Sequence, residues 1–289
     1  MSQPGGQGAV TTRFAPSPNG PLHLGHAYAA LCAHDFARAH GGRFLLRIED
    51  IDAARSRAEF VDGILADMDW LGLRYDGAVI YQSSRVDRYR HALERLCNLG
   101  LIYKCVCTRG DIAAAIRARP VRHGPDGPVY PGLCKGRKVA QDQPYCWRLD
   151  MAKAAAMTGE LGWNDLSAGA QNADPAQFGD IVLWRKDAPA SYHLAATLDD
   201  AADGVTHVVR GKDLFAYTAV HIVLQKRLNL LQPVYWHHDL LCDESGEKLA
   251  KSRGSAALCA LRSAGRDGRE IAQILRSGQL PLGISLSGD

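Results

Sequence analysis

Long apolar runs are absent from this sequence of 289 residues. No stretch of about 18 apolar residues is available to span a bilayer, and residues 1–8 are polar and glycine-rich where a secretory signal needs an apolar core. A strong charge of either sign is also absent: the net charge is +3, which neither requires nor excludes a nucleic-acid partner. Since 46% of the residues are hydrophobic, the chain does not have the composition of a disordered protein. We therefore expect a globular cytoplasmic protein with no membrane segment.

Cysteine is present, but nothing indicates an oxidising compartment. Eight cysteines occur in a chain without an export signal, and the cytosol keeps thiols reduced, so a disulfide framework is not expected. Free cysteine behaves as a small apolar residue and is usually buried. We expect this behaviour of the four cysteines in apolar surroundings, which are Cys32, Cys97, Cys242 and Cys259.

Apolar periodicity in the first hundred residues predicts strands that alternate with helices. The expected elements are strands at 11–15 and 43–48 and helices at 26–40 and 85–99. Ser56 and Glu59 have the spacing of a capping box, which predicts the start of a further helix. Such alternation is typical of an α/β fold, in which helices cover a parallel sheet.

The pattern becomes irregular from Tyr103 to about Lys186 and then regular again. Residues 191–198 and 205–210 resume the periodicity, and a helix at 214–228 and a strand at 234–237 follow. We interpret the irregular part as a module inserted between two halves of one sheet. The expected units are residues 10–102 and 191–255 for the two halves, 103–190 for the inserted module and 256–289 for a short helical tail.

The segment from Arg13 to His26, RFAPSPNGPLHLGH, joins a predicted strand to a predicted helix. Its glycines let the backbone approach an anion, its two histidines can donate to phosphate oxygens, and the helix N-terminus adds N–H groups. Far along the chain, the sequence KLAKS from Lys248 to Ser252 adds two lysines after a turn-prone stretch. Each pattern alone also fits a structural role, a helix cap or an exposed loop. Together they favour a nucleoside triphosphate site.

These motifs resemble the catalytic half of glutamyl-tRNA synthetases, which are class I aminoacyl-tRNA synthetases. The matching segments are RFAPSP from Arg13, HLGH from His23, RIEDID from Arg47, SYHLA from Ser191, VRGKD from Val209 and KLAKS from Lys248. KLAKS departs from the family's usual KMSKS at two positions but keeps both lysines and the serine. The resemblance implies a Rossmann-like class I catalytic domain whose parallel sheet is split by an inserted zinc-binding α+β module.

The chain ends about 37 residues after the lysine motif, where a full glutamyl-tRNA synthetase continues into an anticodon-binding region. In this respect it is similar to the short paralogues that attach glutamate to queuosine. The resemblance implies tRNA-independent activation of L-glutamate by ATP, bound with Mg²⁺, and transfer to the queuosine base at the wobble position of tRNA(Asp). A monomer is expected. Two alternatives stay open: charging of the tRNA 3′ end, and a non-catalytic RNA-binding paralogue.

Roles for individual residues follow from the same resemblance. Charge that develops on phosphate oxygens requires fixed donors, and arginine forks grip carboxylates. The implied catalytic residues are His23, His26, Lys248 and Lys251. ATP would contact His23, Gly25, His26 and Lys251. Glutamate would contact Arg13, Ala15, Ser17, Glu49, Tyr192 and Arg210. Structural alternatives also remain: Arg47 or Arg210 can pair with acidic neighbours, Glu49 can belong to a solvated charge run, and Tyr192 can simply pack.

The inserted module carries Cys105, Cys107 and Cys134 within 30 residues. Zinc favours four tetrahedral sulfur or nitrogen ligands, so three thiols leave one ligand to be found. The family resemblance points to Tyr130, and Cys146 and His123 are rivals. The module is also basic, which suits phosphate contacts but equally suits a solvated loop. Its basic residues are Arg117, Arg119, Arg122, His123, Lys135, Arg137 and Lys138.

Overall fold

The N-terminal part of the chain forms a parallel sheet. The computed structural model describes residues 9–140, 142–249, 256–280 and 283–287. Strands β1 (Thr11–Phe14), β2 (Arg43–Ile48) and β3 (Ile80–Tyr81) are parallel, with Thr11 opposite Arg43. Helices α1 (Leu24–Ala39) and α2 (Ala58–Trp70) connect them. Nearly every residue of β1 and β2 is buried, as expected where helices cover both faces of a parallel sheet.

A second sheet continues the first across a long sequence interval. Its order is β11 (His207–Gly211), β12 (Val234–His238), β8 (Gly162–Asp165) and β9 (Gly169–Asn172), and only β9 is antiparallel. Thr206 N donates to Thr11 O at 3.0 Å, and Thr11 N donates to Thr206 Oγ1 at 2.8 Å, which joins the edges of the two sheets. Helices α6 (Tyr192–Ala202) and α7 (Thr218–Arg227) pack against each other in one apolar core. The carboxyl ends of β1 and β11 therefore lie side by side.

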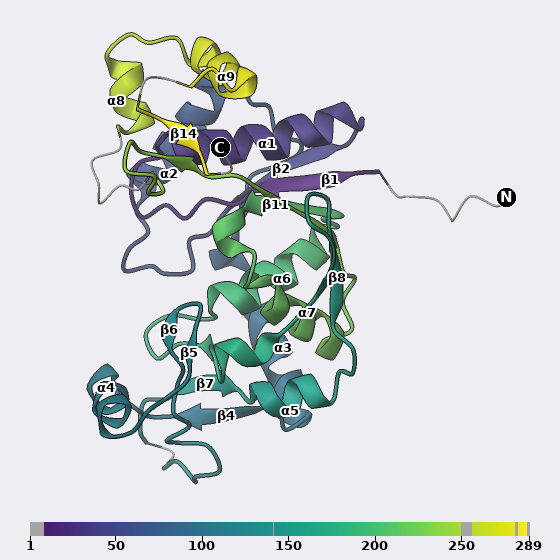
Figure 1. Ribbon diagram of the computed structural model, residues 1–289, viewed down its shortest axis with the longest axis vertical. Coiled ribbons are helices and arrows are strands. Elements are labelled where there is room, and N and C mark those ends of the chain that lie inside the picture. Colours follow the sequence, from purple (N-terminus) through teal and green to yellow (C-terminus); the bar gives the residue numbers. More distant parts are fainter. Residues whose placement is uncertain (1–8, 141, 250–255, 281–282, 288–289) are drawn as a thin grey trace, which may run out of the picture.

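A smaller antiparallel sheet lies in the segment that the sequence analysis interprets as an inserted module. Its order is β10 (Val182–Trp184), β7 (Cys146–Leu149) and β4 (Ile102–Cys105). Helix α3 (Val86–Asn98), after a short 3₁₀ turn, η1 (Gln82–Arg85), leads into it. The module also holds α4 (Arg109–Ala118), the hairpin of β5 (His123–Gly124) and β6 (Gly127–Pro128), α5 (Met151–Ala156) and the 3₁₀ turn η2 (Pro175–Phe178). It occupies the lower end of the molecule in Figure 1.

The C-terminal part packs back on the first sheet. Strand β13 (Leu241–Cys242) pairs with β14 (Ser285–Leu286), and helices α8 (Leu258–Ser263) and α9 (Gly268–Ser277) lie near α1 and α2 at the upper end of Figure 1. Arg276 of α9 forms two hydrogen bonds with Asp35 of α1, at 2.7 and 2.9 Å. Among the described residues, no helix has both the length and the apolarity needed to cross a membrane.

Two local predictions were wrong, and one predicted helix begins later than expected. Helix α2 begins after Arg57 without a side-chain cap, because Ser56 lies in the preceding turn, where its N–H donates to Asp52 O. The helix expected at 214–228 is present as α7 but begins four residues later, after a 3₁₀ turn, η3 (Lys212–Leu214). Cys97 is exposed near the end of α3, so its apolar neighbours in the sequence do not bury it. Of the other three cysteines in this group, Cys242 is buried, and two are partly buried.

Candidate active site

His23 and His26 lie together at the N-terminus of α1. His23 is the N-cap, and its Nδ1 accepts the N–H of Gly25 at 3.1 Å. The His26 Nδ1 accepts the N–H of His23 at 3.2 Å, and the ring centroids are 3.9 Å apart. A Cβ at Gly25 would lie 3.0 Å from His23 Cε1, so glycine gives the imidazole its room. The histidines therefore do cap the helix, at the end where an anion is favoured.

The lysine motif approaches this region from the other sheet. Lys248 is half-exposed and forms an ion pair with Asp213, which follows β11. The bridge between His23 and Ala257 brings the segment after the motif to the helix N-terminus. Lys251 and Ser252 lie outside the described residues. The structure thus places Lys248 beside the carboxyl end of β11, and the chain after the motif beside His23.

Arg13 on β1 is held by a buried carboxylate from α6. Its Nε and Nη2 donate to Asp200 at 2.8 and 3.2 Å, and Nη1 donates to Val209 O at 3.2 Å. Asp200 also accepts from Arg47 Nη1 at 2.8 Å. Burial by itself would raise the pKa of Asp200, but the two guanidinium groups outweigh burial and hold that pKa at about 2. Three of the five Arg13 N–H groups are engaged, which leaves two for a ligand.

Glu49 follows β2 and lies beside the same cluster. Its Oε1 is 3.7 Å from Arg47 Nη2, and its side chain is mostly buried. Burial raises the pKa of Glu49 to about 7, although Arg47 and Arg13 act in the opposite direction. A positive charge placed beside a buried carboxylate stabilises its ionised form, and the ammonium group of an amino acid would supply such a charge. Ala15 and Ser17 lie in the loop after β1, where Ser17 is exposed.

Arg210 on β11 is buried, and all of its hydrogen-bond partners are neutral. Nη1 contacts Tyr192 Oη at 3.3 Å and His221 Nδ1 at 3.4 Å. Nε donates to His237 Nε2 at 3.0 Å, and Nη2 donates to Thr218 Oγ1 at 2.7 Å and to a main-chain carbonyl. No carboxylate among the described residues forms an ion pair with it. A buried cation without a counter-ion is costly, so this arrangement favours an anionic ligand.

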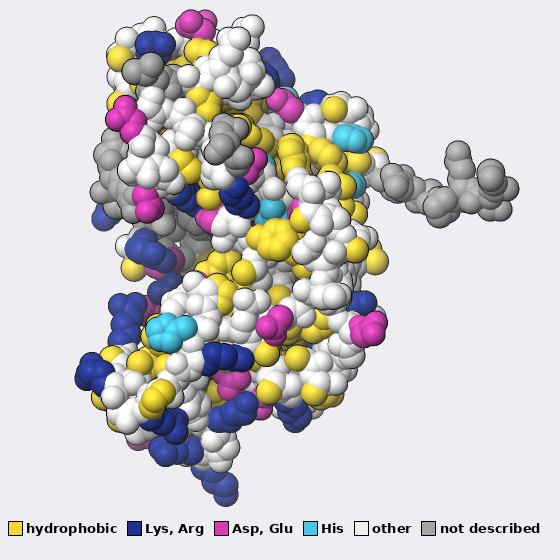
Figure 2. All heavy atoms as spheres, viewed as in Figure 1, with side chains coloured by type: hydrophobic (Ala, Val, Ile, Leu, Met, Phe, Trp, Pro, Cys, Tyr) yellow, Lys and Arg dark blue, Asp and Glu magenta, His cyan; other side chains and the backbone are white. Residues whose placement is uncertain are grey.

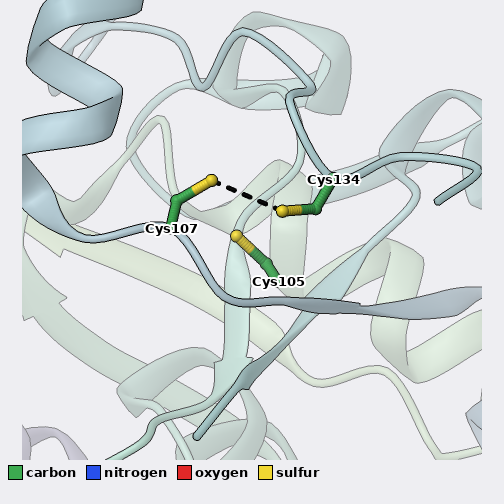
Figure 3. Close-up of side chains that lie close together, drawn as sticks. All are labelled: Cys105, Cys107 and Cys134. Carbon is green, nitrogen blue, oxygen red and sulfur yellow. Dashed lines mark hydrogen bonds between the residues drawn. The ribbon is translucent and has the colours of Figure 1, made fainter. Parts of the chain in front are cut away.

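The three cysteines of the module converge, as Figure 3 shows. The Sγ atoms of Cys105, Cys107 and Cys134 all lie within 4.8 Å of one another, and Cys107 Sγ is 3.4 Å from Cys134 Sγ. Tyr130 Oη lies 3.3 Å from Cys105 Sγ and 3.5 Å from Cys107 Sγ. Around tetrahedral zinc, sulfur atoms lie roughly 3.8 Å apart, so the spacing fits one metal ion. Among the described residues, neither rival ligand, Cys146 or His123, belongs to the three-residue group.

Basic side chains cover the outer surface of the module. Figure 2 shows Lys and Arg gathered at the lower end of the molecule. The seven basic residues noted in the sequence, at positions 117, 119, 122, 123, 135, 137 and 138, are all exposed. The surface therefore presents positive charge where a polyanion can reach it.

Comparison with known proteins places the chain in one family. The family model described as tRNA synthetases class I (E and Q), catalytic domain, matches residues 9–277. The chain belongs to this family. The prediction of a class I synthetase catalytic domain of the α/β type with a parallel sheet is confirmed.

Relatives of this class I synthetase include several proteins named Glutamyl-Q tRNA(Asp) synthetase. The one from Rhodobacter capsulatus is 48% identical over 279 residues, and the match covers 92% of this chain and 99% of that protein. The one from Symbiobacterium thermophilum is 41% identical over 265 residues, with 88% and 81% covered. The resemblance to this branch of the family is thereby confirmed.

A solved structure agrees with the synthetase fold. The glutamate tRNA ligase from Elizabethkingia meningosepticum, in complex with its amino acid, has a TM-score of 0.76 and 25% sequence identity. The match covers 93% of this chain and 60% of that one, so the synthetase described here spans about three fifths of that ligase.

The candidate site contains residues that the sequence did not predict. Asp200 holds Arg13, while Thr218, His221 and His237 surround Arg210. None belongs to a motif with a chemical signature, and Asp200 lies 187 residues from its partner. A clue was available only for Asp200, because three aspartates between positions 199 and 203, at the end of one helix, require cationic partners.

Proposed function

We propose that this synthetase activates L-glutamate with ATP, without tRNA, and transfers the glutamate to the queuosine base at the wobble position of tRNA(Asp). The observation that carries the proposal is the 48% identity that extends over 99% of the Rhodobacter capsulatus protein of that name. The site supports it with a buried Arg210 for a carboxylate, Glu49 for an ammonium group and paired histidines at a helix N-terminus.

In the first step, an α-carboxylate oxygen of glutamate forms a bond to the α-phosphorus of ATP, and pyrophosphate leaves. Negative charge grows on the phosphate oxygens, where His23, His26 and Lys251 would act as donors, with Mg²⁺ bound to the nucleotide. Arg13 and Arg210 would hold the carboxylates, with Tyr192, Ala15 and Ser17 beside them. In the second step, a queuosine hydroxyl attacks the acyl carbon and AMP leaves.

Labelled glutamate tests this assignment. We expect glutamate-dependent exchange of ATP and pyrophosphate without tRNA, followed by an alkali-labile ester that forms only on tRNA(Asp) containing queuosine. Digestion to nucleosides identifies the labelled residue, and tRNA(Asp) without queuosine is the control. Label on the 3′-terminal ribose would replace this proposal with that of a glutamyl-tRNA synthetase. No exchange and no transfer would favour a non-catalytic RNA-binding protein.

We also propose that the module binds one structural Zn²⁺ through Cys105, Cys107, Cys134 and Tyr130. The distances between these four side chains support the ligand set. When bound, zinc would cross-link β4 to the loop that holds the third cysteine. The exposed basic surface of this module is proposed to contact tRNA, and the protein to act as a cytoplasmic monomer.

The fourth zinc ligand can be identified by substitution. Tyr130→Phe removes the phenol oxygen and is expected to weaken zinc binding at least about tenfold, because three thiolates alone leave the tetrahedral set incomplete. Competition with a chromogenic chelator measures the affinity. Cys146→Ser is the matched control and should bind zinc as the unmodified protein does. The opposite ranking of the two variants would make Cys146 the ligand.

A further inference from the structure

Arg210 lies between two imidazoles whose protonation the hydrogen bonds define. A guanidinium N–H only donates, so His237 Nε2, 3.0 Å from Arg210 Nε, must be an acceptor. The proton of His237 therefore resides on Nδ1, which lies 2.7 Å from Asp165 Oδ2. Asp165 thus selects the tautomer of His237 that can accept from Arg210.

The second imidazole, that of His221, carries its proton on the other ring nitrogen. His221 Nδ1 accepts from Arg210 Nη1, so the proton of His221 is on Nε2, which lies 3.3 Å from His193 Nδ1. Burial, and then the charge of Arg210, lower the pKa of His193 and His237 to about 4 and that of His221 well below its usual value. Both imidazoles next to the guanidinium therefore stay neutral at physiological pH.

This arrangement differs from that of the other two buried arginines of the site. Arg13 and Arg47 share the carboxylate of Asp200, so much of their charge is compensated within the protein. The acidic group nearest to Arg210 along the hydrogen-bond chain is Asp165, and a neutral imidazole separates the two. The two longest contacts of Arg210 both involve Nη1, at 3.3 and 3.4 Å. Nη1 is the nitrogen from which a ligand would displace the weakest hydrogen bonds.

We infer that the neutral acceptors around Arg210 make the site specific for an amino acid with a side-chain carboxylate. Among these acceptors, His237 is the positioning residue, because Asp165 orients it and it holds Arg210. The inference rests on the proposed activation of glutamate. A protein carboxylate in place of any one acceptor would compensate Arg210 and leave no charge for the substrate. A neutral amide substrate such as glutamine leaves the buried cation unpaired and is disfavoured.

Thr218 offers a matched pair of substitutions. It is the first residue of α7, is fully buried, and accepts from Arg210 Nη2 at 2.7 Å. Thr218→Asn and Thr218→Asp have nearly the same shape, and each can present an oxygen to Arg210, but only Thr218→Asp adds a negative charge. We expect Thr218→Asp to raise the KM for glutamate at least about 100-fold above that of Thr218→Asn, with the KM for ATP the same in both, because the new carboxylate occupies the guanidinium. The preference for glutamate over glutamine should also be smaller in Thr218→Asp than in Thr218→Asn.

Thermal unfolding of the same pair provides a reading that does not depend on activity. A carboxylate beside an uncompensated buried cation, and at a helix N-terminus, should make Thr218→Asp at least as stable as Thr218→Asn. A lower melting temperature for Thr218→Asp, or equal KM values for glutamate in the two variants, would overturn the inference. If the unmodified protein shows no glutamate-dependent exchange, the proposed function fails instead, and the melting temperatures still decide the charge state of the site.

A double-mutant cycle tests Asp165. The turn N–H groups of Ser167 and Ala168 bind Asp165 Oδ1, so in Asp165→Asn the amide nitrogen should face His237 and favour the wrong tautomer. In the otherwise unmodified protein, we expect Asp165→Asn to raise the KM for glutamate roughly tenfold and to leave the KM for ATP unchanged. In a His237→Gln background the same substitution should raise it less than about twofold, because glutamine has no imidazole tautomer to select. Equal effects in both backgrounds would show that Asp165 acts only through main-chain N–H groups, those of the turn and that of residue 237, and not through the tautomer of His237.

Discussion

Asp200→Asn is expected to lower the free energy of unfolding by about 3–5 kcal/mol, because it leaves the buried Arg13 without its counter-ion and removes the shortest ion pair of the buried Arg47. The ion pairs that remain for Arg47, with Asp203 and Glu49, are longer, at 3.4 and 3.7 Å. Asp200 accepts from Arg13 and Arg47, and the Arg47 side chain is completely buried. Urea denaturation at pH 7 measures the loss. The stabilisation also depends on pH: since the folded-state pKa of Asp200 is held at about 2, stability is complete above the unfolded pKa of about 4 and is lost as the pH falls to about 2.

Asp35→Asn is the matched control for this prediction. Asp35 also forms two hydrogen bonds with one arginine, Arg276, but both side chains of this pair are about 40% exposed. Exposed pairs contribute about 1 kcal/mol or less, so Asp35→Asn should have a small effect. Equal losses in the two variants would mean that the buried cluster on α6 contributes no more than a surface ion pair.

His26→Ala is expected to lower the rate of glutamate-dependent exchange of ATP and pyrophosphate by about 100-fold or more, equivalent to about 3 kcal/mol. The side chain lies beside His23 at the helix N-terminus, where the triphosphate is proposed to bind. Glutamate binding, measured by calorimetry, should therefore change little.

The capping role of His26 must be separated from a catalytic one. Its Nδ1 accepts the N–H of His23, and loss of a cap costs about 1 kcal/mol of stability. His26→Asn can preserve that acceptor. If His26→Asn restores the exchange activity, or if His26→Ala loses glutamate binding as much as rate, then His26 is a structural residue.

Local sequence predicted the elements around the site well. The strand at 43–48 was predicted with its observed bounds, and the helix after the histidine motif begins two residues before its predicted start. Short-range apolar periodicity determines such elements. Cys105, Cys107 and Cys134, which the family resemblance suggested as zinc ligands, also converge in the structure.

The partners of the charged residues could not be predicted in this way. Arg13 was expected to be available for glutamate, but two of its N–H groups, on Nε and Nη2, already donate to Asp200. Strands β8 and β9 lie within the irregular segment, yet they extend the sheet of β11 and β12. These contacts depend on how distant segments pack, which no local pattern contains.

The junction between β1 and β11 has a consequence for biosynthesis. Residues 11 and 206 are hydrogen-bonded neighbours, so the first sheet lacks its partner edge until most of the chain has left the ribosome. At ordinary rates of translation this delay is about 10–40 s, far longer than helices and hairpins need to form. Strand β1, with its buried arginine, would therefore keep one edge unpaired in the nascent chain during this time. A truncated chain without β11 would keep that edge exposed and would be a target for chaperones and proteases.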